Sequence, residues 1–271
     1  MSLSRRRFLR GVGQAGFTAW LGAEFALDAM AAPASAQETQ DATGTERGIL
    51  KVRLLASRLD EMADFYAVKM GWPVSRVGSS LRVRTGGTEM RFDAAPEGAA
   101  PFYHVAWAIP SNKFDIGKAW LYQRAPLLKN SKGHDEFHFK KANRRAVYFK
   151  DPAGNILELI ARDDLGDVVE GPFSLRDVLY VNHVGLVIDN MDETIVALND
   201  SLGLLPTAPP EPNVTKMGDK YRHITLVTKN RLWIPEMEQG AKVFTTEVVM
   251  HGPKRAVYDP PNLPYRISTA S

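Results

Sequence analysis

A pattern of one strand, one helix and several short strands occurs about three times along this chain of 271 residues. It occurs twice within residues 48–162 and once, less regularly, within residues 179–271. In the first copy the apolar run ILKVRLLA (49–56) precedes a helical pattern that Gly71 ends, and three strand-like runs follow. Short β-rich units with one helix each predict an α+β fold whose sheets curl around a cavity.

The segments between these units differ from them in composition. Residues 37–47 are polar and aperiodic, which predicts a flexible leader. Residues 163–178 carry Gly-Pro near their centre and predict a linker. The expected organisation is therefore a signal at 1–36, the leader, a two-unit domain at 48–162, the linker, and a partial third or fourth unit at 179–271.

The N-terminus contains SRRRFLR (4–10), which resembles the twin-arginine export signal. A weakly apolar stretch follows from Gly11, and Ala34-Ser35-Ala36 offers a cleavage site of small residues. The resemblance implies export by the twin-arginine translocase, to the periplasm or the outside of a bacterial cell. The alternative interpretation is a basic arm that binds nucleic acid or a membrane.

The charge balance argues against a nucleic-acid partner. Removing residues 1–36 takes away four arginines and two acids, which leaves 30 basic and 29 acidic residues. A formal charge of +1 does not predict a nucleic-acid surface. The chain has no cysteine, so thiolate metal ligands, cysteine nucleophiles and disulfides are excluded. The sequence also lacks a phosphate-binding glycine loop and a nucleophile elbow.

The stretch VYFKDPAGNILELI (147–160) predicts a β-hairpin with a carboxylate in its second strand. Pro152 presets a turn dihedral, Gly154 allows positive φ, and the flanking Asp and Asn can bond to nearby backbone. The strand alternates, so Glu158 shares one face with two isoleucines. A carboxylate on such an apolar face needs a cation, a metal or hydrogen-bond donors, or it takes up a proton.

These segments resemble the vicinal oxygen chelate superfamily, which includes glyoxalase I, bleomycin-resistance proteins and extradiol dioxygenases. The resemblance rests on YFKDPAGNILEL as a closing hairpin, on YHVAWAIP as an opening strand, and on DFYAVKMGW as the first helix. It implies repeated βαβββ modules that form a curled, cup-like mixed sheet. It also implies metal ligands on the first and last strands of a module, and a small organic substrate with adjacent oxygens. Lyases, isomerases, dioxygenases and plain binding proteins all share this fold.

On the resemblance, two metal-ligand positions carry suitable residues. The acid of the closing strand falls on Glu158, and the histidine that opens the second module falls on His104. Imidazole and carboxylate together suit Fe, Mn, Zn or Ni. The sequence departs from the family elsewhere, because Lys51 stands where the first module often has histidine. The fourth strand offers Glu89 and Arg91 instead of a single clear ligand.

The first hypothesis is a metal-dependent enzyme. His104 and Glu158 would bind the metal, and a third ligand would come from His138 or Glu89. His134 lies in the same loop as His138 and is a further candidate.

The second hypothesis is a metal-free protein of the bleomycin-resistance type that binds or sequesters a small molecule. Lys51 would replace the metal charge and pair with Glu158, because a buried ammonium and carboxylate satisfy each other. Arg91 and Arg145 would attract an acidic or polyphenolic ligand. His104 could then act as an acid or base near neutral pH.

The third hypothesis is structural, with His104 and Glu158 as hydrogen-bonded core residues. His183 opens the third unit, but that unit closes without an acid, so we predict that His183 is a structural histidine. His223 and His251 have no companion at ligand spacing and are also predicted to be structural. Modules of this family pair within one chain or between two, which makes a homodimer a further expectation.

Overall fold

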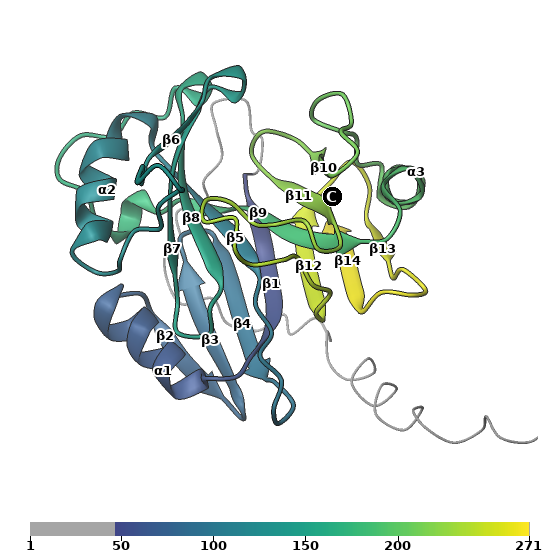
Figure 1. Cartoon of the computed structure of the whole chain (residues 1–271), viewed down its shortest axis with the longest axis horizontal. Helices are drawn as coiled ribbons and strands as arrows, with labels where there is room; N and C mark the ends of the chain where they lie inside the picture. Colours follow the sequence, from purple (N-terminus) through teal and green to yellow (C-terminus); the bar gives the residue numbers. More distant parts are fainter. Residues whose placement is uncertain (1–46, 271) are drawn as a thin grey trace, which may run out of the picture. The chain divides into compact units, whose positions relative to one another are not determined.

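The computed structural model describes residues 47–270, so the predicted signal and most of the predicted leader lie outside the described residues. Within that range the chain forms one mixed sheet of 14 strands (Figure 1). The strands are β1 (Ile49–Ala56), β2 (Val74–Val77), β3 (Ser80–Thr85), β4 (Thr88–Ala94), β5 (His104–Ile109), β6 (Phe137–Phe139), β7 (Arg144–Lys150), β8 (Ile156–Arg162), β9 (Tyr180–Ile188), β10 (Val214–Gly218), β11 (His223–Thr228), β12 (Thr246–His251), β13 (Ala256–Tyr258) and β14 (Tyr265–Ala270).

Three α-helices lie beside this sheet: α1 (Leu59–Asp64), α2 (Phe114–Tyr122) and α3 (Met191–Leu202). A π-helical turn, Phe65–Lys69, continues α1, and short 3-10 turns lie at Ser111–Lys113, Lys140–Ala142, Asp163–Leu165 and Leu175–Asp177. The sequence explains the ends of α3, since the Asn190 side chain accepts from Glu193 N and Gly203 follows with φ of 74°. Among the described residues, no helix has the length and apolarity needed to cross a membrane.

Four modules follow one rule of strand pairing. In each module the first strand lies parallel to the last: β1 with β4, β5 with β8, β9 with β11, and β12 with β14. The first two modules contain a helix and two further strands, as predicted. The third has one strand fewer than these, and the fourth has no α-helix.

The first two modules do not pair with each other, although the sequence predicted that residues 48–162 form one two-module domain. Strand β5 of the second module pairs antiparallel with β9 of the third, and β1 of the first pairs antiparallel with β12 of the fourth. We call the β1–β4 and β12–β14 modules the first cup, and the β5–β8 and β9–β11 modules the second cup. Residues 48–162 therefore do not form a cup by themselves, because each of their modules finds its partner beyond the expected linker. The pairing occurs within one chain.

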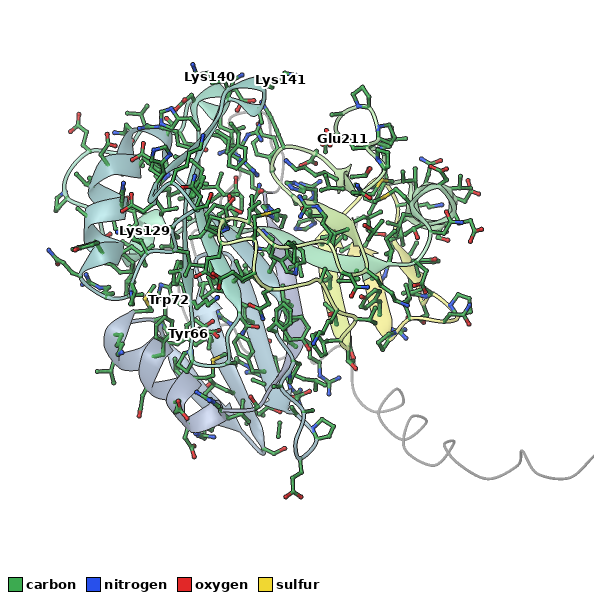
Figure 2. The ribbon with its side chains drawn as sticks, viewed as in Figure 1. Tyr66, Trp72, Lys129, Lys140, Lys141 and Glu211 are labelled. Carbon is green, nitrogen blue, oxygen red and sulfur yellow. The ribbon has the colours of Figure 1, made fainter. Side chains whose placement is uncertain are left out.

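The hairpin between β7 and β8 has the predicted turn chemistry. Asp151 accepts backbone bonds from Ala153 and Asn155, and Gly154 adopts a φ of 87°. Asp151 is also buried and accepts a bond of 2.8 Å from the Tyr66 hydroxyl. Figure 2 shows Tyr66 on the side of the sheet that carries α1. The turn thus joins the two strands and links them to the helix of the first module.

Candidate metal centre in the second cup

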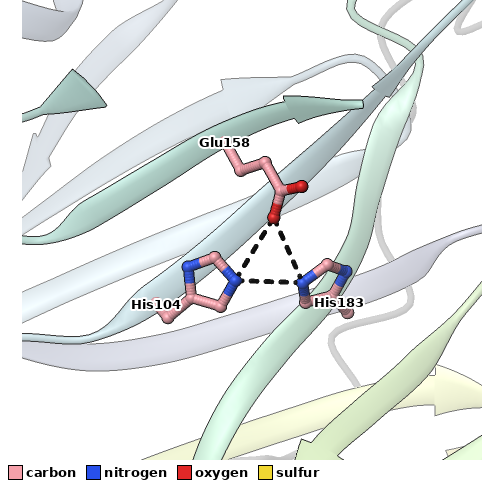
Figure 3. Close-up of side chains that lie close together, drawn as sticks. All are labelled: His104, Glu158 and His183. Carbon is pink, nitrogen blue, oxygen red and sulfur yellow. Dashed lines mark hydrogen bonds and ion pairs between the residues drawn. The ribbon is translucent and has the colours of Figure 1, made fainter. Parts of the chain in front are cut away.

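Three buried side chains meet in the second cup: His104 on β5, Glu158 on β8 and His183 on β9 (Figure 3). Their exposed fractions are 5%, 1% and 2%. The two Nε2 atoms lie 3.0 Å apart, and Glu158 Oε2 lies 3.4 Å from His104 Nε2 and 3.6 Å from His183 Nε2. Within residues 47–270 this is the one group of histidine, cysteine and acidic side chains close enough to share an ion.

Strand register explains how residues distant in the sequence reach one point. His104 lies opposite Ile156 in the parallel ladder of β5 and β8, so Glu158 lies two residues further along and faces the same side. In the antiparallel ladder of β5 and β9, His183 lies opposite Ala106. Alternation places His104 and Ala106 on one face of β5. The side chains of His104 and His183 therefore point into the same cup.

The neighbours of the two imidazoles determine which nitrogen of each ring carries the proton. His104 Nδ1 lies 3.0 Å from the Ile156 carbonyl oxygen, so Nδ1 is the donor. His183 Nδ1 lies 3.1 Å from Asn182 Oδ1. The Asn182 amide donates from Nδ2 to the carbonyls of Lys220 and Tyr221, which fixes its oxygen toward His183. In the neutral rings, both Nε2 atoms therefore present lone pairs to each other and to Glu158.

The charges of the site agree with this arrangement. Burial alone would raise the pKa of Glu158, but the positive charge of Arg144 and the contact with His104 outweigh it and hold the pKa below its usual value. Burial, followed by the neighbouring His223 and His104, lowers the pKa of His183 well below its usual value. At neutral pH the site thus contains a carboxylate and a neutral His183.

The separations fit a shared metal ion. Ligand atoms about 2.1 Å from one metal lie about 3.0 Å apart at right angles and about 3.4 Å apart at a tetrahedral angle. The observed separations of 3.0, 3.4 and 3.6 Å are close to these values. The set of two imidazoles and one carboxylate also matches the donors that divalent transition metals bind. The residues present therefore fit a metal, and the prediction that His104 and Glu158 lie together is confirmed.

A cavity of about 620 Å³ opens onto the triad. Its walls carry five buried polar atoms for which no hydrogen-bond partner is present in the described part of the chain: Arg144 Nε, Tyr148 Oη, Glu158 Oε1, His223 Nε2 and Thr225 Oγ1. Burial and the charge of Glu158 raise the pKa of Tyr148 well above its usual value, so its hydroxyl keeps its proton. Thr225 Oγ1, His223 Nε2 and the Tyr148 hydroxyl are available to a ligand, and the Tyr148 hydroxyl also lies close to Glu158. Apolar wall is supplied by Phe139, Val214, Trp233 and Ile234.

The repeat relates the two halves of the second cup. His183 lies opposite His223 in the ladder of β9 and β11, as His104 lies opposite Ile156. The residue two positions further along is Glu158 in the second module and Thr225 in the third. A neutral hydroxyl thus stands where a fourth ligand would be expected, and the candidate site has three ligands among the described residues.

The first cup has an ion-paired cluster on the corresponding strands. Arg53 on β1 contacts Asp93 on β4 at 2.5 Å and Glu247 on β12 at 3.0 Å. These are the first and last strands of one module and the first strand of its partner, as in the triad. Arg53 pairs with both carboxylates there and Arg91 also pairs with Asp93, so arginine side chains already balance the negative charge. The second cup is therefore the candidate for a metal centre.

The structure does not bring the other predicted residues to this site. His138 is exposed and contacts Glu136 at 3.0 Å, so it is not the third ligand. Lys51 is exposed on β1 of the first cup, whereas Glu158 is buried in the second, so the predicted Lys51–Glu158 ion pair is wrong. The reason is the pairing of modules, which separates β1 from β8. His134 is exposed in its loop.

Three further candidates lie outside the cavity walls. Glu89 lies near Arg82 and Arg84 on neighbouring β3. Arg91 bonds to Asp93 and Ser80 within the first cup. Arg145 donates to the Ser111 carbonyl and packs over Phe114 beside α2, because alternation along β7 turns it away from Arg144. Glu89 is therefore not the third ligand, and the prediction that Arg91 and Arg145 line the binding pocket is wrong.

Sequence reasoning missed His183 as a candidate ligand and His223 as a wall residue. The available signal was the likeness of VNHVGLVI to YHVAWAIP, since both histidines open a module. The acid for His183 was sought within its own module, but the neighbouring module supplies it. His223 stacks on His183 with ring centroids 4.6 Å apart.

Comparison with known proteins gives support at the level of the fold. No family model matches the sequence, and no curated protein does so either. Among solved structures, a "putative dioxygenase" from Bacillus subtilis superposes with a TM-score of 0.53 at 15% identity, covering 82% of this chain and 85% of that one. Glyoxalase I from Zea mays gives a TM-score of 0.49 at 12% identity, covering 82% and 92%. At these identities the likeness concerns the fold alone. The predicted α+β fold, a mixed sheet of repeated glyoxalase-like modules, is confirmed.

Proposed function

We propose that this protein is a metal-dependent enzyme of the dioxygenase type that acts on a small organic molecule with two adjacent oxygens. His104, His183 and Glu158 would hold the metal. Fe(II) is the ion that a set of two histidines and one carboxylate suits best, although Mn, Zn and Ni accept the same donors.

One observation supports this proposal above the others. Two Nε2 lone pairs and an ionised carboxylate converge at 3.0 to 3.6 Å in a buried position. Groups that repel one another in this way are stable together when a cation lies between them. A cluster of hydrogen-bonded core residues would instead need a donor at one of these atoms.

The number of ligands favours oxygen chemistry over isomerisation within the same fold. A bound metal would act as a Lewis acid and provide open positions for neighbouring oxygens. Three protein ligands with open positions are the pattern of non-haem iron oxygenases. Thr225 occupies the place of a fourth charged ligand and so leaves room for a substrate.

The residues of the cavity wall have definite parts in this proposal. The Tyr148 hydroxyl donates a hydrogen bond to a substrate oxygen, because its raised pKa keeps it protonated. His223 Nδ1 faces the Asp219 carbonyl at 3.2 Å, so Nε2 accepts a hydrogen bond from a substrate hydroxyl. Trp233 packs on the His104 ring at 5.1 Å and limits the entry of water from that side.

The test begins with elemental analysis of purified full-length protein, with His104→Ala and Glu158→Ala as variants. We expect about one transition-metal ion per wild-type chain and loss of that ion in both variants. Oxygen uptake by iron-loaded protein is then compared with 1,2- and 1,3-dihydroxybenzene, and uptake is expected only when the two oxygens are adjacent. A wild type that binds no transition metal would refute the proposal.

We further propose that the protein is exported in folded form by the twin-arginine translocase. The support is the segment SRRRFLR and the small-residue site that follows it. Folding before export would allow the metal to be acquired in the cytoplasm.

A further inference from the structure

The cavity wall contains more positive than negative charge. Six of its residues are lysine or arginine and three are acidic. Two of the six are bound elsewhere, because Arg162 pairs with Asp164 and Lys220 donates to a backbone carbonyl. Lys141 is exposed on the loop before β7 (Figure 2). The remaining cations are Arg144, Lys216 and Arg231, and none of them forms an ion pair with a carboxylate of residues 47–270.

Arg144 is the most buried of these three cations. Its exposed fraction is 8%, and its Nε atom has no hydrogen-bond partner in the described chain. Its guanidinium lies over the Phe139 ring, 4.1 Å from the centroid, in a cation–π contact, and the negative charge that acts on it is that of Glu158, with which it forms no direct ion pair. Burying this guanidinium costs desolvation energy, which the cation–π contact and the charge of Glu158 offset without a direct ion pair.

Lys216 lies beside the candidate metal centre. It stands opposite Thr225 in the ladder of β10 and β11, at the position that corresponds to Tyr148 opposite Glu158 in the other half of the cup. Burial and then the charge of Arg144 lower its pKa to about 8. The ammonium is therefore still charged at neutral pH and lies close enough to Arg144 for repulsion.

Acidic neighbours offset only part of this excess of positive charge. Glu158 interacts with Arg144 and favours the charged form of Lys216, but it is one carboxylate beside several cations and is also a candidate metal ligand. Glu211 is exposed on the loop before β10 (Figure 2), and its negative charge favours the charged forms of Lys216 and Arg231 without contacting either as an ion pair. Asp219 pairs with Arg222. Among residues 47–270, Arg231 donates only to the Leu232 carbonyl, and burial lowers its pKa.

We infer that Arg144, Lys216 and Arg231 form an anion-binding subsite that receives a carboxylate group of the substrate. This inference rests on the proposed function and narrows the substrate to an acid that carries two adjacent oxygens at one end and a carboxylate at the other. A guanidinium binds a carboxylate through two parallel hydrogen bonds, and the ammonium adds a third donor. Phe139 and Trp233 also line the cavity and can pack against the carbon skeleton that connects the two ends of the substrate.

The test compares 3,4-dihydroxyphenylacetate with its methyl ester, which keeps the adjacent hydroxyls and lacks the charge. Binding to metal-loaded protein is measured by calorimetry at pH 7 for wild type, Lys216→Met and Arg231→Met. Lys229→Met is the matched control, because it removes one positive charge from an exposed residue paired with Asp189, outside the cavity wall. Arg144 is not substituted, since its charge acts on Glu158.

We expect wild type to bind the acid at least about tenfold more tightly than the ester, as expected for a charge-assisted contact. Lys216→Met and Arg231→Met should each lose about tenfold in affinity for the acid and leave the ester unchanged. The control should behave as wild type. Equal affinity of wild type for acid and ester, or equal weakening of both ligands in the variants, would overturn the inference.

Two measurements separate this inference from the metal proposal. Metal content of the variants should equal that of wild type, and their thermal melting should show that they fold. The same titrations on chelator-treated protein isolate the subsite. If wild-type protein takes up no metal on loading and still prefers the acid to the ester, the subsite is supported and the metal centre is refuted. Stoichiometric metal without any preference for the acid refutes the subsite alone.

Discussion

Replacing His183 with leucine distinguishes the three-ligand site from the two-ligand site that the sequence predicted. Leucine fills a similar volume and offers no lone pair, so the change removes a ligand and leaves His104 and Glu158 in place. Metal at a thousand times its dissociation constant stabilises a folded protein by about 4.1 kcal/mol. For a domain of this size, that raises the melting temperature by about 8–16 °C.

Loss of one ligand lowers this gain by an amount that can be calculated. Mutation of a residue that only hydrogen-bonds to a metal ligand weakens metal affinity by about 10- to 100-fold. Loss of the ligand itself should therefore weaken metal affinity by at least about 100-fold. At the same metal concentration the stabilisation falls to about 1.4 kcal/mol. The expected gain in melting temperature is then about 3–6 °C.

The assay is differential scanning calorimetry of each protein with metal and with chelator. Taking the difference within each variant removes the effect of leucine on packing. His138→Ala is the control, because His138 was predicted to be a ligand and is exposed at a distance from the triad. An unchanged gain in His183→Leu, or a reduced gain in His138→Ala, would refute the assignment of His183.

Three further predictions follow from other parts of the chain. Burial raises the pKa of Asp151 to about 6, above its value in the unfolded chain, so the folded state binds more protons there. The free energy of unfolding therefore falls as the pH rises from about 4 to 6, by up to about 3 kcal/mol. Urea unfolding should show this slope in wild type and lose it in Asp151→Asn. A Cβ on Gly185 would lie 2.6 Å from Trp233, so Gly185→Ala should cost about 1–3 kcal/mol and shift tryptophan emission, and unchanged values of both would contradict the contact. In the double variant Arg5→Lys, Arg6→Lys, the full-length protein should stay in the cytoplasm, as measured by cell fractionation. Continued export of this variant would exclude the twin-arginine route.

Local signals predicted individual elements well because their causes are local. The turn at 151–155 depends on the conformations of its own residues, and the ends of α3 depend on Asn190 and Gly203. Alternation along β8 placed Glu158 on a buried face, and the structure agrees. The prediction that Arg145 lines the pocket was wrong, and the reason is also local. The face of β7 that points into the cup carries Arg144 and Tyr148, so Arg145 points to the other side.

The sequence by itself determined the repeated α+β modules, the burial of Glu158 and the approach of His104 to it, because parallel pairing of the first and last strands is a property of one module. Only the tertiary structure decided which modules share a cup. The opening strand of each module has an apolar edge with which the opening strand of several other modules could pair. No local sequence signal distinguishes these possible partners. The observed pairing of modules places His183 next to Glu158 and keeps Lys51 in the other cup. The candidate metal centre therefore depends on an interface between modules.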